Sequence, residues 1–250
     1  MRALTLVFAH PDDETFATGG TIARCADEGI AAHLYCATDG GAGKSSGIAV
    51  ESRETLERLR RAELERAARI LGLASVRHGG HADGALGQVD ADVLVGEIVE
   101  LLRDTRPHVV VTFGPEGAPT AHRDHRAISR AATAAFFLAG NPTAYAEQLA
   151  GGRTAWAPSR LLYVTWKGPA DGAVVKVNGL PVDLVVDVRA QLARKREAFH
   201  AHATQRQHEA SFEALAMHRG EGYALAAGRP FPARADGGPA RDPFEGLDAD

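Results

Sequence analysis

Two short motifs in the sequence combine histidine with aspartate at close spacing. They are Ala9-His10-Pro11-Asp12-Asp13-Glu14 and His122-Arg123-Asp124-His125. Imidazole nitrogens and carboxylate oxygens are typical ligands of catalytic zinc sites, which keep one coordination position open for water. His10, Asp13 and His125 could therefore hold one ion between them. Because adjacent residues of an extended chain point to opposite sides, Asp12 could face the bound water while Asp13 binds the metal.

Each motif also has a purely structural alternative. Asp12 or Asp13 could cap the helix that follows, although a cap needs one carboxylate and leaves the preceding histidine unexplained. Asp124 could likewise cap a helix or belong to the metal site. We favour the cap, and the carboxylate could also orient a nearby imidazole. His122 and His125 could lie in a solvated first helical turn. The presence of both motifs in one chain favours the metal site.

Short apolar runs alternate with longer amphipathic ones up to about residue 139, which predicts strands alternating with helices. Strands are expected at Ala3–Ala9, Ala32–Thr38, Ser75–His78 and Pro107–Phe113. Helices are expected over Gly20–Glu28, Glu51–Leu71, Ala91–Asp104 and Asp124–Leu138. The fold class is therefore α/β, a Rossmann-like, mostly parallel sheet sandwiched by helices. Because each motif follows a strand, this fold would bring both to the carboxyl edge of the sheet, where ligands bind.

After residue 140 the pattern changes to a smaller C-terminal region with a β-hairpin and a helix. Leu161–Trp166 is typical of a strand, and Val174–Val177 and Val182–Val188 flank the turn signal Asn178-Gly179. A helix is expected from Ala190 to about Ala203. Residues 229–250 are rich in Pro, Gly and charge, which favours loose order. We expect one domain over residues 1–227 and a loosely ordered tail over residues 228–250.

Composition excludes several classes of protein. The 250 residues suffice for a core without disulfides, and 28 basic against 32 acidic residues give a net charge of −4. That balance argues against recognition of nucleic acid or an anionic membrane through bulk charge. Cys25 and Cys36 lie in apolar runs, which fits a reducing compartment. With no signal peptide and no apolar stretch of about 20 residues, we expect a cytoplasmic protein, and homo-oligomerisation stays open.

The two motifs make the chain similar to the zinc-dependent N-deacetylases of the LmbE and PIG-L type, which share an AHPDDE and an HxDH segment. The similarity covers residues 3–227. Supporting matches are Arg60 with Glu63, Asp83-Gly84, Gly114-Pro115-Glu116-Gly117, Lys195, and His202-Ala203-Thr204-Gln205. The resemblance implies removal of an N-acetyl group from an N-acetylglucosamine-type glycoside, with biosynthesis of a bacillithiol- or mycothiol-type thiol as one context. Tailoring of another acetylated amine or an antibiotic is the alternative.

The resemblance also implies roles for the motif residues. His10, Asp13 and His125 correspond to the metal ligands, and zinc is the expected ion, although Fe2+ or another divalent ion would suit the same ligands. Asp12 corresponds to the general base and acid. His122 corresponds to the residue that stabilises the oxyanion, and we expect it to act as an imidazolium.

Other positions carry weaker expectations. Arg60 and Asp83 stand where relatives contact the sugar of the substrate. Glu14 could make a contact behind the metal ligands or simply place a negative charge near a helix N-terminus. Arg123 replaces the proline often found in this motif of the family.

A loop of glycines offers an alternative of a different class. Gly40-Gly41-Ala42-Gly43-Lys44-Ser45 nearly matches a phosphate-binding P-loop, but Thr38 occupies the place of the required first glycine. A P-loop-like nucleotide-binding protein is therefore the alternative, and otherwise residues 40–52 form a mobile specificity loop beside the site. The roles of three further histidines stay open: His78, His81 and His202.

Overall fold

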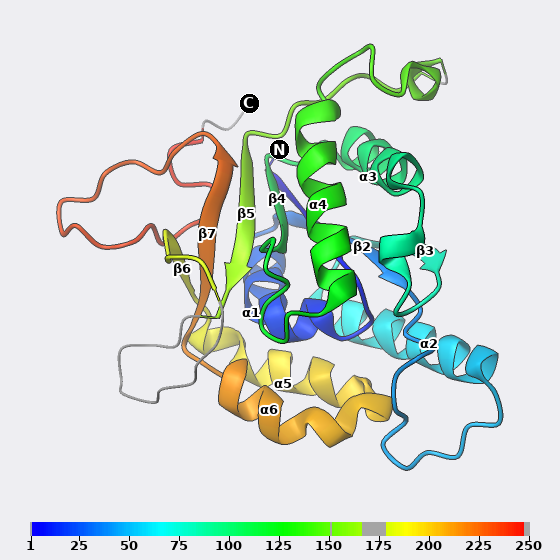
Figure 1. Cartoon of the computed structure of the whole chain (residues 1–250). Coiled ribbons are helices and arrows are strands. Elements are labelled where there is room, and N and C mark those ends of the chain that lie inside the picture. The colour runs from blue at the N-terminus through cyan, green and yellow to red at the C-terminus, as the bar shows by residue number, and fades with distance from the viewer. Residues whose placement is uncertain (1, 151, 167–178, 248–250) are drawn as a thin grey trace.

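The computed structural model describes residues 2–150, 152–166 and 179–247. Within these residues one seven-stranded sheet has the order β3-β2-β1-β4-β5-β7-β6 (Figure 1). Its strands are β1 (Ala3–Phe8), β2 (Ala31–Thr38), β3 (Ser75–His81), β4 (Val109–Phe113), β5 (Arg160–Thr165), β6 (Leu184–Asp187) and β7 (Gly220–Gly228). The strands β3, β2, β1, β4 and β5 are all parallel, and β7 pairs antiparallel with both β5 and β6.

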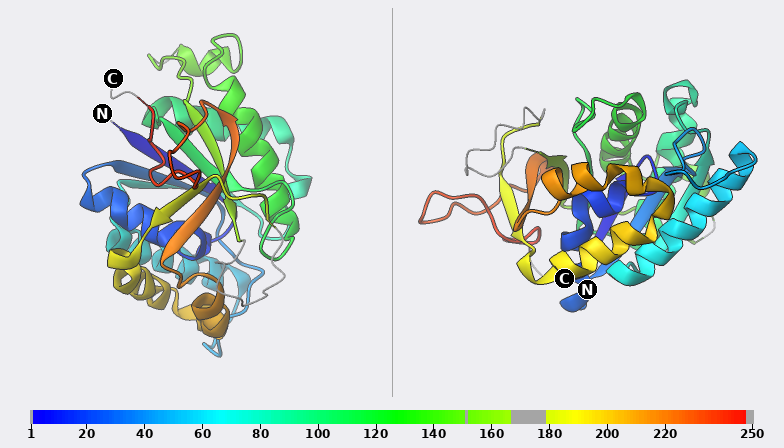
Figure 2. Two further views of the ribbon diagram at one scale, coloured as in Figure 1. Left: turned by 90° about the vertical axis from the view of Figure 1, so that its left-hand side faces the viewer. Right: turned by 90° about the horizontal axis from the view of Figure 1, so that it is seen from below.

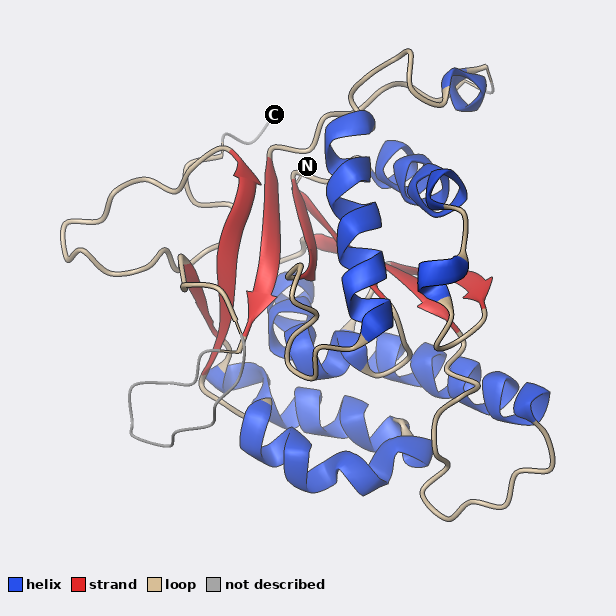
Figure 3. Ribbon diagram, viewed as in Figure 1, coloured by secondary structure: helices blue, strands red, loops and turns tan. Residues whose placement is uncertain are grey.

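Helices cover both faces of the sheet (Figures 2 and 3). They are α1 (Asp13–Asp27), α2 (Arg53–Leu71), α3 (Ala91–Thr105), α4 (Arg123–Leu138), α5 (Leu192–Ala201) and α6 (Glu209–Leu215). Helices α3 and α4 pack together on one face, whereas α1, α2 and α5 pack together on the other. The predicted α/β sandwich with a mostly parallel sheet is confirmed.

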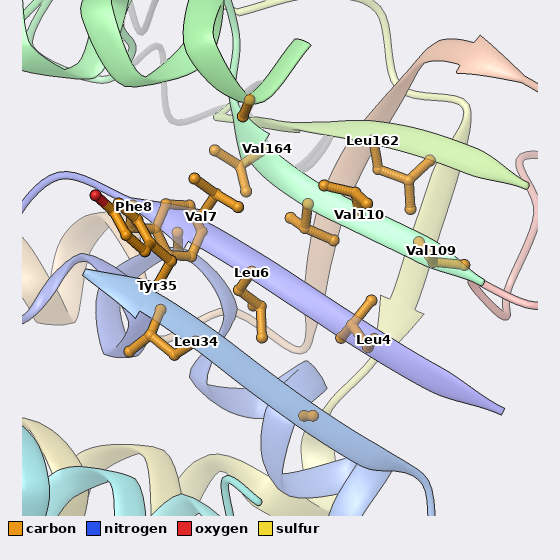
Figure 4. Packing of buried hydrophobic residues seen from close by; sticks show 14 of the residues in the cluster. Leu4, Leu6, Val7, Phe8, Leu34, Tyr35, Val109, Val110, Leu162 and Val164 are labelled. Atoms are coloured by element: carbon orange, nitrogen blue, oxygen red, sulfur yellow. The ribbon is translucent and has the colours of Figure 1, made fainter. Parts of the chain in front are cut away.

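The core lies along the central strands, as Figure 4 shows. Every residue of β1 and of β4 is buried, which is expected of parallel strands with helices on both faces. Leu4, Leu6 and Val110 are 0% exposed. The thiols of Cys25 and Cys36 are free and buried, as expected of small core residues. No helix of the described residues is long and apolar enough to cross a membrane.

The start of the chain departs from the expected helix boundary. Helix α1 begins at Asp13 rather than near Gly20, so it starts within the first motif and contains its last two residues, Asp13 and Glu14. The expected helix from Ala190 is α5, which begins at Leu192. Strand β7 was not predicted; it pairs with β6, which lies within the expected Val182–Val188 strand. The other half of the predicted hairpin, Val174–Val177 with Asn178, lies outside the described residues.

Residues 229–247, which belong to the segment expected to be loose, pack against the sheet. Arg160 is 0% exposed, and its guanidinium donates to four carbonyl oxygens, those of Arg229, Pro230, Pro243 and Glu245. Phe244 is buried in the same hydrophobic cluster as the central strands. This segment has few aliphatic residues, but one buried cation with fixed acceptors orders it.

Candidate active site

The two motifs lie side by side at one edge of the sheet. The first motif follows β1 and runs into α1, and the second forms the N-cap and first residues of α4, after the loop that follows β4. Strands β1 and β4 are parallel neighbours. Their carboxyl ends are therefore adjacent, as the fold prediction required. The His10 ring lies 4.8 Å from the His122 ring and 5.3 Å from the His125 ring, between centroids. Phe113 stacks on His125 with centroids 3.9 Å apart, which fixes the orientation of that imidazole.

Asp13 links the two histidines expected to bind metal. Its Oδ2 atom lies 3.3 Å from His10 Nδ1, and its Oδ1 atom lies 3.3 Å from His125 Nε2. Burial would raise the pKa of the Asp13 carboxyl, but His125 and His10 together lower it well below its usual range. The carboxylate is therefore ionised, as a metal ligand must be.

The geometry and chemistry of this group fit a divalent ion. Ligands about 2.0–2.1 Å from a tetrahedral zinc lie roughly 3.3 Å from one another, which matches the Asp13 contacts with both imidazoles. On its other side, His10 Nε2 lies 3.1 Å from Asp83 Oδ1 and 3.4 Å from Asp124 Oδ2. Carboxylates behind a histidine ligand orient the ring and increase its basicity. Nitrogens of His10, His122 and His125 also lie within 4.8 Å of one another.

Asp12 has an unusual backbone conformation, and it lines the same cavity as His10 and His125. Its φ of 109° and ψ of −25° are rare for a non-glycine residue, and its side chain makes no capping hydrogen bond to α1. The capping alternative therefore does not hold for Asp12. Burial raises the pKa of its carboxyl to about 6, although Arg60, with Nη2 at 3.6 Å from Oδ1, opposes the shift.

His122 is the N-cap of α4. Its Nδ1 atom accepts a hydrogen bond from the Asp124 backbone N–H at 3.2 Å, so a neutral ring carries its proton on Nε2. Burial and the neighbouring His10 and His125 lower the pKa of His122 below its ordinary value. These surroundings work against the imidazolium that we expect at His122.

Asp124 does not cap α4, contrary to our expectation. Its buried carboxylate instead accepts from the backbone N–H groups of Gly84 at 2.6 Å and Leu86 at 3.2 Å, and it contacts His10. The sequence could not distinguish the two roles, because the loop that supplies these donors lies about 40 residues earlier. Asp83, from that same loop, accepts from the Ala42 N–H at 2.9 Å as well as contacting His10.

Arg60 and Glu14 are both held inside the protein. Arg60 is 4% exposed and donates to the carbonyl oxygens of Pro11 at 2.6 Å and Gly40 at 2.9 Å. Glu14 is 0% exposed and accepts from the Asp12 N–H at 3.0 Å. Its other oxygen lies 2.8 Å from His202 Nε2. His202 therefore has a buried partner, a contact that the sequence did not reveal.

Most of the predicted site residues share a cavity of about 450 Å³, although Glu14 and Asp124 do not line it. Lining it are His10, Asp12, Asp13, Arg60, Asp83, His122 and His125. Sequence reasoning did not single out several other lining residues from the C-terminal half: Trp166, His208, Ser211 and Leu215. They come from the part of the chain where periodicity was weak. His78 and His81 do not line this cavity; they bind Glu65 and Glu97 instead.

The glycine-rich loop does not have the architecture of a P-loop. A P-loop leads directly into a helix whose N-terminus faces the phosphates. Here α2 begins only at Arg53, well after Ser45, and the Gly40 carbonyl is bound by Arg60. The nucleotide-binding alternative is not favoured by this geometry.

Comparison with known proteins identifies the family. Residues 5–136 match the family model PIG-L, described as GlcNAc-PI de-N-acetylase. The chain belongs to this family. A PIG-L-type relative from Rhodococcus jostii (strain RHA1), 1D-myo-inositol 2-acetamido-2-deoxy-alpha-D-glucopyranoside deacetylase, is 34% identical over 82% of both chains. A probable N-acetyl-alpha-D-glucosaminyl L-malate deacetylase 2 from Bacillus cereus is 36% identical over 52% of this chain and 59% of its own.

A solved structure has the same PIG-L-type fold. N,N'-diacetylchitobiose deacetylase from Pyrococcus horikoshii superimposes with a TM-score of 0.74 over 90% of this chain and 83% of its own, at 21% identity. At that identity the likeness shows the fold. Family membership rests on the sequence matches, and the protein is an enzyme of the PIG-L deacetylase family with a candidate His/Asp metal site.

Proposed function

We propose that the protein uses zinc to hydrolyse the acetamide of an N-acetylglucosamine-type glycoside. The observation that carries the proposal is the convergence of His10, Asp13 and His125 from two distant motifs, with Asp12 free of any capping contact beside them. His10, Asp13 and His125 would hold the ion. When bound, zinc lowers the pKa of a coordinated water towards about 7 and polarises the acyl oxygen.

Two residues of the chain would transfer the proton and stabilise the developing negative charge. Asp12 would accept the proton of the attacking water and later donate it to the amine nitrogen that leaves. Its carboxyl lines the same cavity as the candidate metal ligands, which places it within the site for both transfers. His122, with its Nδ1 occupied by the Asp124 N–H, presents Nε2–H to the oxyanion of the tetrahedral intermediate.

The substrate class follows from the cavity and the relatives. A volume of about 450 Å³ lies within the range of roughly 300–1,000 Å³ for sites that take small molecules. Asp83 would accept from sugar hydroxyls and the remaining Arg60 N–H groups would donate to them. The named relatives act on glucosaminides of inositol and of malate. We propose a small polar glycoside of this kind, made on the way to a low-molecular-weight thiol.

Acetate release tests the proposal. The zinc-loaded protein would be assayed on N-acetylglucosaminyl-inositol, N-acetylglucosaminyl-malate, free N-acetylglucosamine and an acetylated amine that is not a sugar. We expect release from at least one glycoside, loss after chelation, and recovery on adding zinc, with Fe2+ as the comparison ion. An active chelated enzyme, or activity confined to the non-sugar amine, would contradict the proposal.

A further inference from the structure

The peptide bond between Pro11 and Asp12 is held from both sides by buried charged groups. The Pro11 carbonyl accepts from Arg60 at 2.6 Å, and the Asp12 N–H donates to Glu14 Oε2 at 3.0 Å. Arg60 is 4% exposed and Glu14 is 0% exposed. Water therefore does not replace either contact, and the plane of this peptide is fixed.

This restraint coincides with the unusual backbone of Asp12. A non-glycine residue with φ of 109° is strained, and this conformation persists only where its surroundings enforce it. Such strained residues cluster at active sites, where they aim a side chain. Rotation of the Pro11–Asp12 peptide would change φ of Asp12, and with it the direction of its carboxylate.

A histidine from the far end of the chain fixes the Glu14 side chain. His202, which follows α5, places Nε2 at 2.8 Å from Glu14 Oε1, and both residues are 0% exposed. The hydroxyl of Thr15 donates to the same oxygen at 2.5 Å. With one carboxylate oxygen occupied in this way, the other is directed at the Asp12 N–H. Neither Glu14 nor His202 lines the cavity.

We propose that Glu14, held by His202, is a positioning residue that aims the Asp12 carboxylate into the cavity. This inference rests on the proposed role of Asp12 as general base. It also gives His202 a task at the site, although its side chain cannot reach the substrate. The competing interpretation is purely structural, in which the Glu14–His202 contact only joins α1 to the end of α5.

Substitutions at Glu14 separate the two interpretations. Glu14→Leu removes both acceptors, and we expect kcat to fall by about 10²-fold, the effect of roughly 1 Å of misplacement, with KM and bound zinc unchanged. Glu14→Gln keeps one oxygen for the Asp12 N–H, so its kcat should be close to that of the wild type. His202→Leu, which only frees the carboxylate, should cost roughly tenfold. Full kcat in both leucine variants, or loss of zinc that accounts for the decrease, would overturn the proposal.

Glu63 provides a matched control. It is a second buried carboxylate, 3% exposed, and it accepts from the N–H and hydroxyl of Thr204, two residues after His202. It makes no hydrogen bond to the Pro11–Asp12 peptide among the described residues. Glu63→Leu should lower the melting temperature but leave kcat close to that of the wild type. An equal loss of kcat in Glu63→Leu would favour the structural interpretation.

A double-mutant cycle gives a stricter test. If Glu14 acts through Asp12, adding Glu14→Leu to Asp12→Asn should reduce kcat no further, because residues that act as a unit are not additive. A repeat of the full 10²-fold loss in that background would contradict the proposal.

A crystal structure of Glu14→Leu gives a readout that needs no activity. We expect Asp12 to leave its φ of 109°, and an unchanged φ would overturn the positioning role. If the wild type released no acetate from any substrate, the proposed function would fail, while this structure would still decide the role of Glu14.

Discussion

Asp13 Oδ1 lies 3.3 Å from His125 Nε2, although the two residues belong to the first turns of different helices, α1 and α4. The contact depends on β1 and β4 being parallel neighbours, so that the helices that follow them both begin at one edge of the sheet. It joins the two motifs into a single candidate ligand group.

His125→Ala should abolish stoichiometric zinc binding, because it removes one of two imidazole ligands. Bound metal after dialysis, measured by inductively coupled plasma mass spectrometry, checks this. His81→Ala is the matched control, since His81 binds Glu97 outside the cavity and should leave zinc content unchanged. Full zinc occupancy in His125→Ala would exclude His125 as a ligand.

Asp12→Asn should keep its zinc and lose about 10²–10⁴-fold in kcat, the usual contribution of general acid–base catalysis. The amide preserves the size of the side chain but cannot accept the proton of water. Metal content and acetate release are measured on the same preparation. An Asp12→Asn enzyme as fast as the wild type would exclude the proposed base.

His122→Asn should separate the capping role of His122 from its catalytic role. Asparagine is a good N-cap and can still accept from the Asp124 N–H, so thermal stability should stay close to that of the wild type. Removing the Nε2–H donor should lower kcat by about 10²–10³-fold. If stability fell while kcat was unchanged, His122 would be only a cap.

Glu221→Gln should destabilise the fold by roughly 3–5 kcal/mol, as expected when one partner of a buried ion pair is removed. Lys195 is 0% exposed and its Nζ lies 2.6 Å from Glu221 Oε1. The double variant with Lys195→Met should be less destabilised, because no buried charge is left unpaired. Urea unfolding measures the stability of the single and the double variant. Equal stabilities of these two variants would contradict the expected coupling of Lys195 with Glu221.

The stability of the fold should depend on pH through His202. Burial acts to lower the pKa of this imidazole, but Glu14 raises it above the ordinary value of 6.5. Protonation therefore favours the folded state. The stabilisation is fully present below about pH 6.5 and is lost as pH rises through the higher folded pKa. The difference in unfolding free energy between wild type and His202→Gln should shrink with rising pH; a difference that grows would contradict this sign.

The meeting of the two motifs at one edge of the sheet was easier to predict from the sequence than the bounds of the elements around them. Strong apolar runs made β1 and β4 recognisable, and their parallel pairing followed from the alternation of strands and helices. The start of α1 was missed because Gly19 and Gly20 weaken the helical pattern. Tertiary packing explains those glycines, since a Cβ on Gly20 would lie 2.5 Å from Val188 Cβ.

Other features depended on contacts between distant parts of the chain. Strand β7 is rich in alanine and glycine, which have little strand preference, and it forms because β5 and β6 flank it. The choice of His122 over Asp124 as the cap of α4 depends on donors from Gly84 and Leu86, which no local pattern reveals.

The contacts of the Arg160 guanidinium limit how far the C-terminus of this protein can be truncated. Cutting after residue 227 keeps both motifs but strips away all four carbonyl oxygens that this cation binds. The truncated protein would hold a buried cation without acceptors, and we expect it to be insoluble. Fusion partners and purification handles therefore belong beyond Leu247, or at the opposite terminus.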